Sequence, residues 1–244
     1  MRTGTAELLE RFGKKDRRAL AELLTLVEQG QAPPLPEPAG YPPIPTRVIG
    51  ITGSGGAGKS TLVGELVAHL RREGLTVAVL ACDPQSPVTG GALLGDRIRV
   101  RFESADEGVY FRSLSTRGAS GGISAAVKPA IEWLKAFGFN VVLVETVGVG
   151  QDQIGVRDAV DTMVLLVTPH TGDEVQWEKA GILEVADLVV VNKSDLSGAQ
   201  RVRQQLTSAL SLSQQGANVP VLSTTAATGQ GVPELWSAIV SRAC

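Results

Sequence analysis

Cysteine, histidine and aromatic side chains are scarce in this sequence of 244 residues. It holds two cysteines, two histidines and 4% aromatic residues. Two cysteines, Cys82 and Cys244, exclude a disulfide scaffold and a zinc site with four cysteine ligands. No run approaches the ~18 apolar residues that cross a membrane. The formal net charge of −2 gives no general attraction to nucleic acid or anionic lipid. We therefore expect a cytoplasmic protein whose partners are neither nucleic acids nor membranes.

The first 32 residues predict a helical extension rather than a targeting signal. They mix acidic with basic side chains and lack the apolar stretch of a signal peptide. Residues 5–28 have the spacing of an amphipathic helix, in which Gly13 is a candidate break and Asp16 a candidate cap of the second half. The apolar face consists of Leu20, Leu23, Leu24 and Val27. We therefore expect residues 1–32 to form a short N-terminal helical extension.

A proline-rich segment follows this extension. Residues 33–45 hold seven of the 13 prolines in the chain, and so many prolines keep a chain extended and semi-rigid. We interpret residues 33–46 as a linker, with a polyproline ligand for a partner domain as the alternative. The remaining residues, 47–244, are expected to form one domain.

Apolar segments and amphipathic segments alternate from residue 47 onward. The predicted strands are 47–52, 76–82, 109–113, 140–145, 162–168, 188–191 and 219–223. The predicted helices are 59–73, 121–137, 173–185, 197–211 and 232–242. Several of the strands are continuous apolar runs, which are typical of strands buried on both faces. The sequence therefore predicts the α/β class, with a mostly parallel central sheet flanked by helices.

A glycine-rich segment between the first predicted strand and the next helix has the G-x-x-x-x-G-K-S pattern of a phosphate loop. Glycines let successive backbone N–H groups converge on phosphate oxygens, and the N-terminus of the following helix adds positive potential. Lys59 is expected to reach the β- and γ-phosphates, and Ser60 to ligate Mg²⁺. The nucleotide-binding residues predicted here are Gly53, Ser54, Gly55, Gly56, Ala57, Gly58, Lys59, Ser60 and Thr61.

A second motif, Asn192-Lys193-Ser194-Asp195, follows a buried predicted strand. The carboxylate of Asp195 can accept hydrogen bonds from both N1–H and the 2-amino group of guanine, whereas adenine presents an acceptor at N1. Asn192 suits the O6/N7 edge of the base, and the stem of Lys193 can pack over its face. The motif therefore predicts GTP and GDP, rather than ATP, as the ligands.

A third segment lies after the last predicted strand, at residues 225–231. It is similar to the S-A-x-x-G-x-G loop of guanine-binding proteins, with Thr225 in place of the serine. The N–H of Ala226 is expected to meet guanine O6. An ordinary structural turn is the alternative interpretation.

Acidic residues at the ends of predicted strands indicate a magnesium site. Glu145 closes an apolar strand shortly before Gly148, whose N–H is a candidate sensor of the γ-phosphate. Asp83 follows the second strand, where a carboxylate can contact Mg²⁺ or activate water. The spacing of Asp96 alone leaves open a switch residue, a helix cap or a solvated charge, and Gln151 is a candidate for orienting water. The predicted catalytic residues are Lys59, Asp83 and Glu145.

With these motifs, the chain resembles the ArgK/MeaB family of P-loop GTPases. Members of that family are chaperones of adenosylcobalamin-dependent acyl-CoA mutases such as methylmalonyl-CoA mutase. The resemblance spans about residues 14–240 and includes GSGGAGKSTL, DPQSPVTGGALLGDRIR, ETVGVGQ and TGDEVQWEKAGILEVADLVVVNKSD. It implies that GTP binding and hydrolysis are coupled to loading of the intact cofactor and release of the damaged one.

The resemblance also implies roles for individual residues. It places a third mobile segment at residues 172–182, where Asp173 and Lys179 relay the nucleotide state to the mutase. The Mg²⁺ ligands that it implies are Ser60, Asp83, Asp96 and Glu145.

Two departures from the family pattern leave questions open. The family continues into a C-terminal dimerisation arm, whereas this sequence stops at Cys244, so monomer and homodimer both remain open. Gln153 stands where the family has an acid. The alternative functions are a nickel-insertion metallochaperone GTPase, for which Cys82 and His69 are poor ligands, a kinase-like phosphotransferase, and a nucleotide-binding adapter without turnover.

Overall fold

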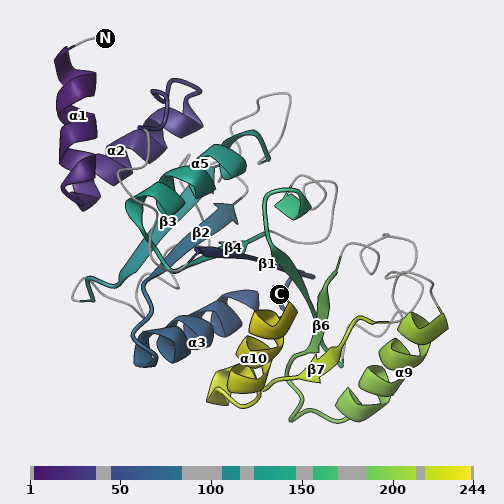
Figure 1. Cartoon of the computed structure of the whole chain (residues 1–244). Coiled ribbons are helices and arrows are strands. Elements are labelled where there is room, and N and C mark those ends of the chain that lie inside the picture. The colour runs from purple at the N-terminus through teal and green to yellow at the C-terminus, as the bar shows by residue number, and fades with distance from the viewer. Residues whose placement is uncertain are drawn as a thin grey trace.

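A seven-stranded, all-parallel sheet forms the centre of the molecule, in the order β3-β2-β4-β1-β5-β6-β7 (Figure 1). This computed structural model describes residues 3–36, 45–83, 106–115, 124–146, 156–169, 186–212 and 218–242. For Thr3, Asp83, Ser115 and Ser124 it describes the backbone alone. The strands confirm the predicted α/β class with a parallel sheet.

Each strand lies within about two residues of its predicted bounds. The strands are β1 Arg47–Gly53, β2 Val77–Asp83, β3 Val109–Ser115, β4 Val141–Glu145, β5 Thr162–Val167, β6 Leu188–Val191 and β7 Val221–Ser223. Every residue of β4, β5 and β6 is buried. Burial on both faces explains why these strands read as continuous apolar runs.

Helices cover both faces of the sheet (Figure 1). On one face lie α3 (Lys59–Arg72) and α10 (Val232–Arg242), packed against residues such as Ile49 of β1. On the other lie α2 (Arg17–Glu28) and α5 (Ser124–Phe137), packed against residues such as Val48. The α9 helix (Ala199–Leu212) packs on β5, β6 and β7. None of the helices in the described ranges has the length and apolar character to cross a bilayer.

The predicted helix break at Gly13 can be compared with the structure, whereas one of the predicted helices cannot. The predicted break after Gly13 is confirmed, because α1 (Thr3–Gly13) ends there and α2 begins after Asp16. Asp16 caps α2 by accepting hydrogen bonds from the N–H groups of Arg18 and Ala19. The helix predicted at 173–185 lies outside the described residues.

The α2 helix is part of the layer that covers the sheet. Its apolar residues Leu20, Leu23 and Leu24 belong to the same buried cluster as Cys82 of β2 and Leu114 of β3. The division into an extension (1–32), a linker (33–46) and a domain (47–244) stays a prediction. Within it, α2 of the predicted extension shares a hydrophobic core with the sheet of the predicted domain.

Polar contacts fasten α2 to β3, which is an edge strand. The guanidinium of Arg112 on β3 donates to Thr25 Oγ1 at 3.1 Å and pairs with the carboxylate of Glu28. At the other end of the helix, Arg17 donates to the Val109 carbonyl and lies over the Tyr110 ring, 5.4 Å from its centroid. These contacts tie the helix layer to the strand at one end of the sheet order within the described residues.

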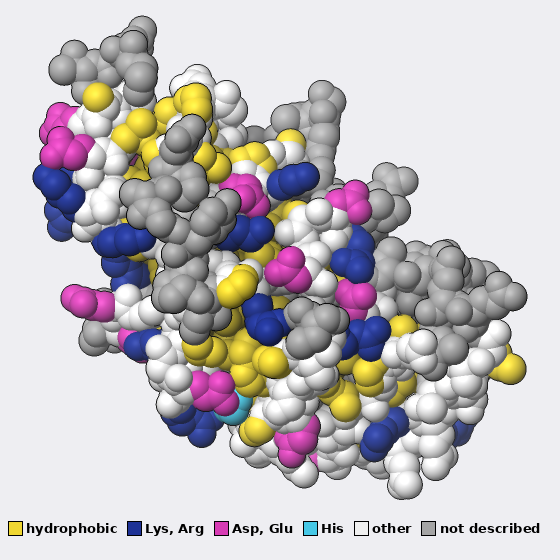
Figure 2. Space-filling model, viewed as in Figure 1, with side chains coloured by type: hydrophobic (Ala, Val, Ile, Leu, Met, Phe, Trp, Pro, Cys, Tyr) yellow, Lys and Arg dark blue, Asp and Glu magenta, His cyan; other side chains and the backbone are white. Residues whose placement is uncertain are grey.

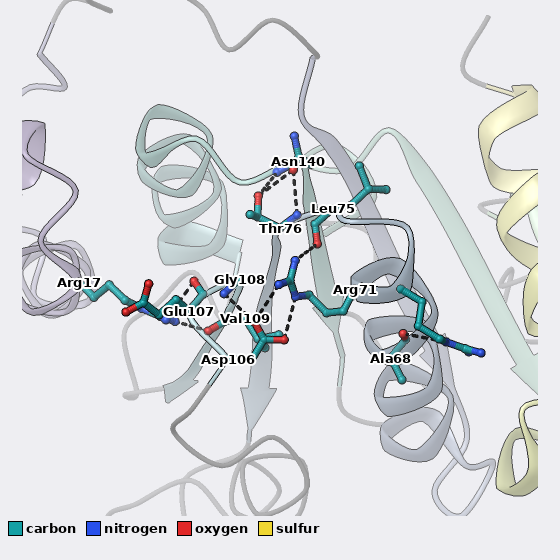
Figure 3. Close-up of polar contacts among 11 residues, drawn as sticks. Arg17, Ala68, Arg71, Leu75, Thr76, Asp106, Glu107, Gly108, Val109 and Asn140 are labelled. Atoms are coloured by element: carbon teal, nitrogen blue, oxygen red, sulfur yellow. Dashed lines mark hydrogen bonds and ion pairs between the residues drawn. The ribbon is translucent and has the colours of Figure 1, made fainter.

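A second group of polar contacts holds the start of β3 to the end of α3 (Figure 3). Arg71 binds both carboxylate oxygens of Asp106 at 2.8 Å and also donates to the Leu75 carbonyl at 2.7 Å. The Asp106 carboxylate accepts the Gly108 N–H as well, at 2.8 Å. The hydrogen bond from Arg71 is the main reason that the pKa of Asp106 lies below its usual value. On the face in Figure 2, Lys and Arg side chains are interspersed with Asp and Glu among the described residues.

The shared core predicts that α2 unfolds together with the sheet. Leu24 is 0% exposed, so Leu24→Ala is expected to lower the free energy of unfolding by about 2–5 kcal/mol in urea titrations. Leu212→Ala is the matched control, because Leu212 is 88% exposed and should cost about 0.5 kcal/mol or less. Equal costs for the two variants would contradict this account.

The pairing of Asp106 with Arg71 predicts a contribution to stability that depends on pH. A carboxyl whose pKa is lowered by folding stabilises the protein above its unfolded pKa of about 3.9, and the gain is lost as the pH falls through the folded pKa. At pH 7 the free energy of unfolding of the wild-type protein should therefore exceed that of Asp106→Asn by about 0.5–1 kcal/mol. Urea titrations should show this gap narrowing as the pH falls below about 3.9, and a gap that does not change with pH would refute the prediction.

Candidate nucleotide and magnesium site

The predicted phosphate loop lies at the carboxyl end of β1 and leads into α3. Gly53 has φ 149°, and a Cβ there would lie 2.4 Å from the carbonyl oxygen of Leu166. Gly58 has φ 91° and precedes α3, and a Cβ at that position would lie 2.5 Å from Asn192 Nδ2. Both positions therefore require glycine, for backbone conformation and for space.

Lys59 lies inside this loop. Its side chain is directed back across the loop, so that Nζ donates to the carbonyls of Gly53 at 2.8 Å and Ser54 at 3.1 Å. The residue is 8% exposed, and burial lowers the pKa of its amine while the charge of Glu145 acts in the opposite direction. The arrangement keeps a cation at the place where the phosphates of a nucleotide are expected.

Ser60 and Glu145 meet beside the loop. Ser60 Oγ donates to Glu145 Oε1 at 2.6 Å, although the two residues are 85 positions apart. The register of the sheet brings them together, because Glu145 ends β4 opposite Ile51 of the neighbouring β1. A hydroxyl and a carboxylate are hard oxygen donors of the kind that Mg²⁺ prefers, so the residues present fit this ion.

Asn192 joins the phosphate loop to the loop after β7. Its Nδ2 donates to the Ala57 carbonyl at 2.8 Å, and its Oδ1 accepts from Thr224 Oγ1 and from the Ala226 N–H, both at 3.0 Å. The side chain is 2% exposed. The Asn192 amide and the Ala226 N–H, both predicted to meet the edge of the guanine, are hydrogen-bonded to each other in the structure. Asn192 therefore links the two loops of the site, which the motif alone did not indicate.

The other residues of the predicted guanine site lie at the carboxyl ends of β6 and β7. Asp195 and Lys193 are exposed, and Lys193 has the positive φ of 57° that is uncommon outside glycine. Thr225 is buried, and its N–H donates to the Gln230 carbonyl at 3.0 Å. This edge of the sheet thus brings the predicted base-binding residues to the same side as the phosphate loop.

The structure places Asp83 by its backbone alone. Asp83 ends β2, two residues beyond Ala81, which pairs with Glu145 of β4. It therefore lies at the same edge of the sheet as Ser60 and Glu145. The remaining predicted site residues lie outside the described ranges, and their roles stay predictions: Asp96, Gly148, Gln151, Asp173 and Lys179.

A parallel sheet with a lysine-containing phosphate loop after its central strand defines the class of P-loop NTPases. Residues 20–243 match the family model described as "Methylmalonyl Co-A mutase-associated GTPase MeaB". The chain belongs to this family, which confirms the resemblance to the ArgK/MeaB GTPases, and it is a GTPase.

Individual relatives agree with this assignment. The chain is 48% identical over 240 residues to a putative GTPase of Pyrococcus horikoshii, covering 96% of this chain and 76% of that protein. It is 37% identical over 247 residues to the GTPase ArgK of Escherichia coli, covering 96% of this chain and 75% of that protein. A mouse protein named "Methylmalonic aciduria type A homolog, mitochondrial" is 41% identical over 194 residues, which is 77% of this chain and 47% of that protein.

Solved structures show the same fold. A "LAO/AO transport system kinase" superposes with a TM-score of 0.76 and 31% identity, covering 99% of this chain and 76% of that one. HypB of Helicobacter pylori in complex with nickel superposes with a TM-score of 0.62 and 16% identity, covering 94% of this chain and 95% of that one. At 16% identity the second likeness concerns the fold alone.

The contacts of Asn192 predict a large effect of its removal on nucleotide binding. Asn192→Ala leaves the Ala57 carbonyl and the Ala226 N–H without this partner, and each lost bond costs about 1 kcal/mol. We expect the dissociation constant of GDP, measured by calorimetry, to rise by about tenfold or more.

Asn140→Ala is the matched control for this experiment. Asn140 Oδ1 accepts from the N–H and the hydroxyl of Thr76, each at 2.8 Å, at the opposite edge of the sheet (Figure 3). That variant should lose stability in the same way yet bind GDP within about twofold of wild type. Equal losses of affinity in the two variants would show that Asn192 acts through general stability only.

Proposed function

We propose that the chain is a Mg²⁺-dependent GTPase chaperone of the cytoplasm. Its nucleotide state is coupled to the loading and protection of adenosylcobalamin in an acyl-CoA mutase such as methylmalonyl-CoA mutase. Support for this partner comes from the family description, which names association with that mutase. The name of the mouse relative, which refers to methylmalonic aciduria, is consistent with this partner.

The observation that carries the nucleotide chemistry is the contact between Ser60 and Glu145. In the proposed site Ser60 and Glu145 hold Mg²⁺, with Asp83 and Asp96 as the further predicted ligands. The ion supplies positive charge that neutralises phosphate oxygens when it is bound. The 2.6 Å between Ser60 Oγ and Glu145 Oε1 supports this proposal, because it brings two oxygen donors together beside the phosphate loop.

The other residues of the site bind and orient the nucleotide. Backbone N–H groups of the phosphate loop and the ammonium of Lys59 bind the phosphates, while Asp195 accepts hydrogen bonds from guanine. In phosphoryl transfer, positioning and charge stabilisation provide almost all of the catalysis. We therefore propose that hydrolysis is slow in isolation and that the mutase stimulates it.

A second candidate function is phosphotransfer to protein. It is favoured by the name of one similar structure, a "LAO/AO transport system kinase" with 31% identity. The Asn192-Lys193-Ser194-Asp195 motif argues for guanine and against ATP as the donor. Phosphate that remains on the protein after incubation with labelled ATP would support this candidate.

Turnover of GTP in the presence of an adenosylcobalamin-dependent mutase tests the proposal. With Mg²⁺, we expect slow release of phosphate from GTP by the protein alone, at least tenfold faster release with the mutase and its cofactor, and no matching response with ATP. Lys59→Ala should abolish turnover, because the loop then lacks its cation.

Lys135→Ala is the matched lysine control, because Lys135 is on α5 and pairs with Glu132 at 3.1 Å, away from the phosphate loop. It should leave turnover unchanged. GTP hydrolysis without any response to the mutase would contradict the proposed partner and leave the GTPase assignment intact. Full turnover by Lys59→Ala would contradict the proposed site.

A further inference from the structure

We infer that Ser194 is a positioning residue that holds the carboxylate of Asp195 in place for the guanine base. The inference rests on the proposed guanine-binding role of Asp195. Ser194 occupies the third position of the Asn192-Lys193-Ser194-Asp195 motif, for which the motif specifies no residue type. The structure nevertheless gives it two contacts to the neighbouring loop.

Both contacts of Ser194 go to the loop that follows β7. Its N–H donates to the Thr224 carbonyl at 3.0 Å. Its hydroxyl shares a hydrogen bond with the Thr225 hydroxyl, with 3.0 Å between the two oxygens. One bond from the backbone and one from the side chain fix both the position and the rotation of the residue directly before Asp195.

Asp195 needs this support because its own surroundings are open. The residue is exposed and lies in a turn that the Leu196 N–H closes by donating to the Lys193 carbonyl at 3.0 Å, directly after Lys193 at φ 57°. A left-handed conformation at a residue other than glycine costs about 1 kcal/mol and persists only where surrounding contacts enforce it. Ser194 supplies contacts of this kind on the side next to Asp195.

The other partner of this contact is itself rigidly held. Thr225 is 6% exposed. Its N–H donates to the Gln230 carbonyl at 3.0 Å, and its carbonyl accepts from Thr228 Oγ1 at 3.1 Å. The Ser194 hydroxyl therefore ties the Asp195 segment to a fixed point.

The consequence concerns base selection. A carboxylate that accepts from both N1–H and the 2-amino group of guanine must lie in the plane of the base, since hydrogen bonds weaken steeply with angle. Inosine nucleotides keep N1–H and lack the 2-amino group. A displaced Asp195 weakens the hydrogen bond to the 2-amino group of guanine, a bond that hypoxanthine cannot make. The ratio of the affinities for the two bases therefore reports the position of Asp195.

The test compares the dissociation constants of GDP and IDP, measured with Mg²⁺ by calorimetry. We expect Ser194→Ala to lower the preference for GDP over IDP by about three- to tenfold, the equivalent of one lost hydrogen bond. Ser194→Thr keeps the hydroxyl and should restore the preference. An unchanged ratio, including equal weakening of both nucleotides, would overturn the inference.

Two further variants keep the test decisive. Ser237→Ala is the matched control, because its hydroxyl makes a single 3.0 Å bond to the Pro233 carbonyl in α10, and it should leave the ratio unchanged. Thr225→Val removes the other hydroxyl at nearly constant volume and should lower the ratio as Ser194→Ala does. The variant that combines Ser194→Ala with Thr225→Val should have the same preference for GDP over IDP as either single variant, because both changes remove the same hydrogen bond. Additive losses of preference would refute the inference.

A separate variant distinguishes failure of the guanine assignment itself. Xanthine carries a carbonyl at the 2-position, which the amide of Asp195→Asn can meet as a donor. We expect Asp195→Asn to favour XDP over GDP. If it does not, the role of Asp195 in the proposed function fails. If it does and Ser194→Ala leaves the ratio unchanged, only the positioning role fails.

Discussion

The carboxamide of Asn192 holds the two halves of the nucleotide site together. Its Nδ2 reaches the phosphate loop at Ala57, and its Oδ1 reaches the loop after β7 at Ala226. The approach is so close that Gly58 must lack a side chain, since a Cβ would lie 2.5 Å from Nδ2. A buried amide with donors and acceptors satisfied in this way specifies a single geometry, because any shift leaves a buried polar group without its partner.

The parallel sheet makes this contact possible. In an all-parallel sheet every strand ends at the same edge, so loops that are distant in sequence converge there. Ser60 and Glu145 meet because β1 and β4 are neighbours, and the loop of Asn192 meets that of Thr224 because β6 and β7 are neighbours. The site is therefore a consequence of strand order, because neighbouring strands bring these side chains within hydrogen-bonding distance of one another.

Local sequence patterns predicted much of this structure and missed contacts that depend on packing. The strands, the phosphate loop and the Asp16 cap have signals within a few residues, in apolar runs, glycines or capping groups. The attachment of α2 to β3 through Arg112 and Glu28 joins residues 84 positions apart, and no local pattern encodes it. No local pattern indicates the proposed role of Ser194 either, because that role depends on its contact with Thr225, which lies 31 positions away.

The two ends of the site are built from different kinds of interaction. At the base end, the contacts of Asn192, Ser194 and Thr225 join uncharged groups and respond little to salt or pH, while the charged group proposed to bind guanine, Asp195, is exposed. At the phosphate end, Lys59 and Glu145 are charged and buried. Their electrostatic energies therefore depend strongly on the charge of the phosphates and of the ion bound beside them. GTP and GDP share one base and differ only in phosphate. The base end can thus stay fixed through a hydrolysis cycle while the phosphate end, at the start of α3, carries the difference between the two states.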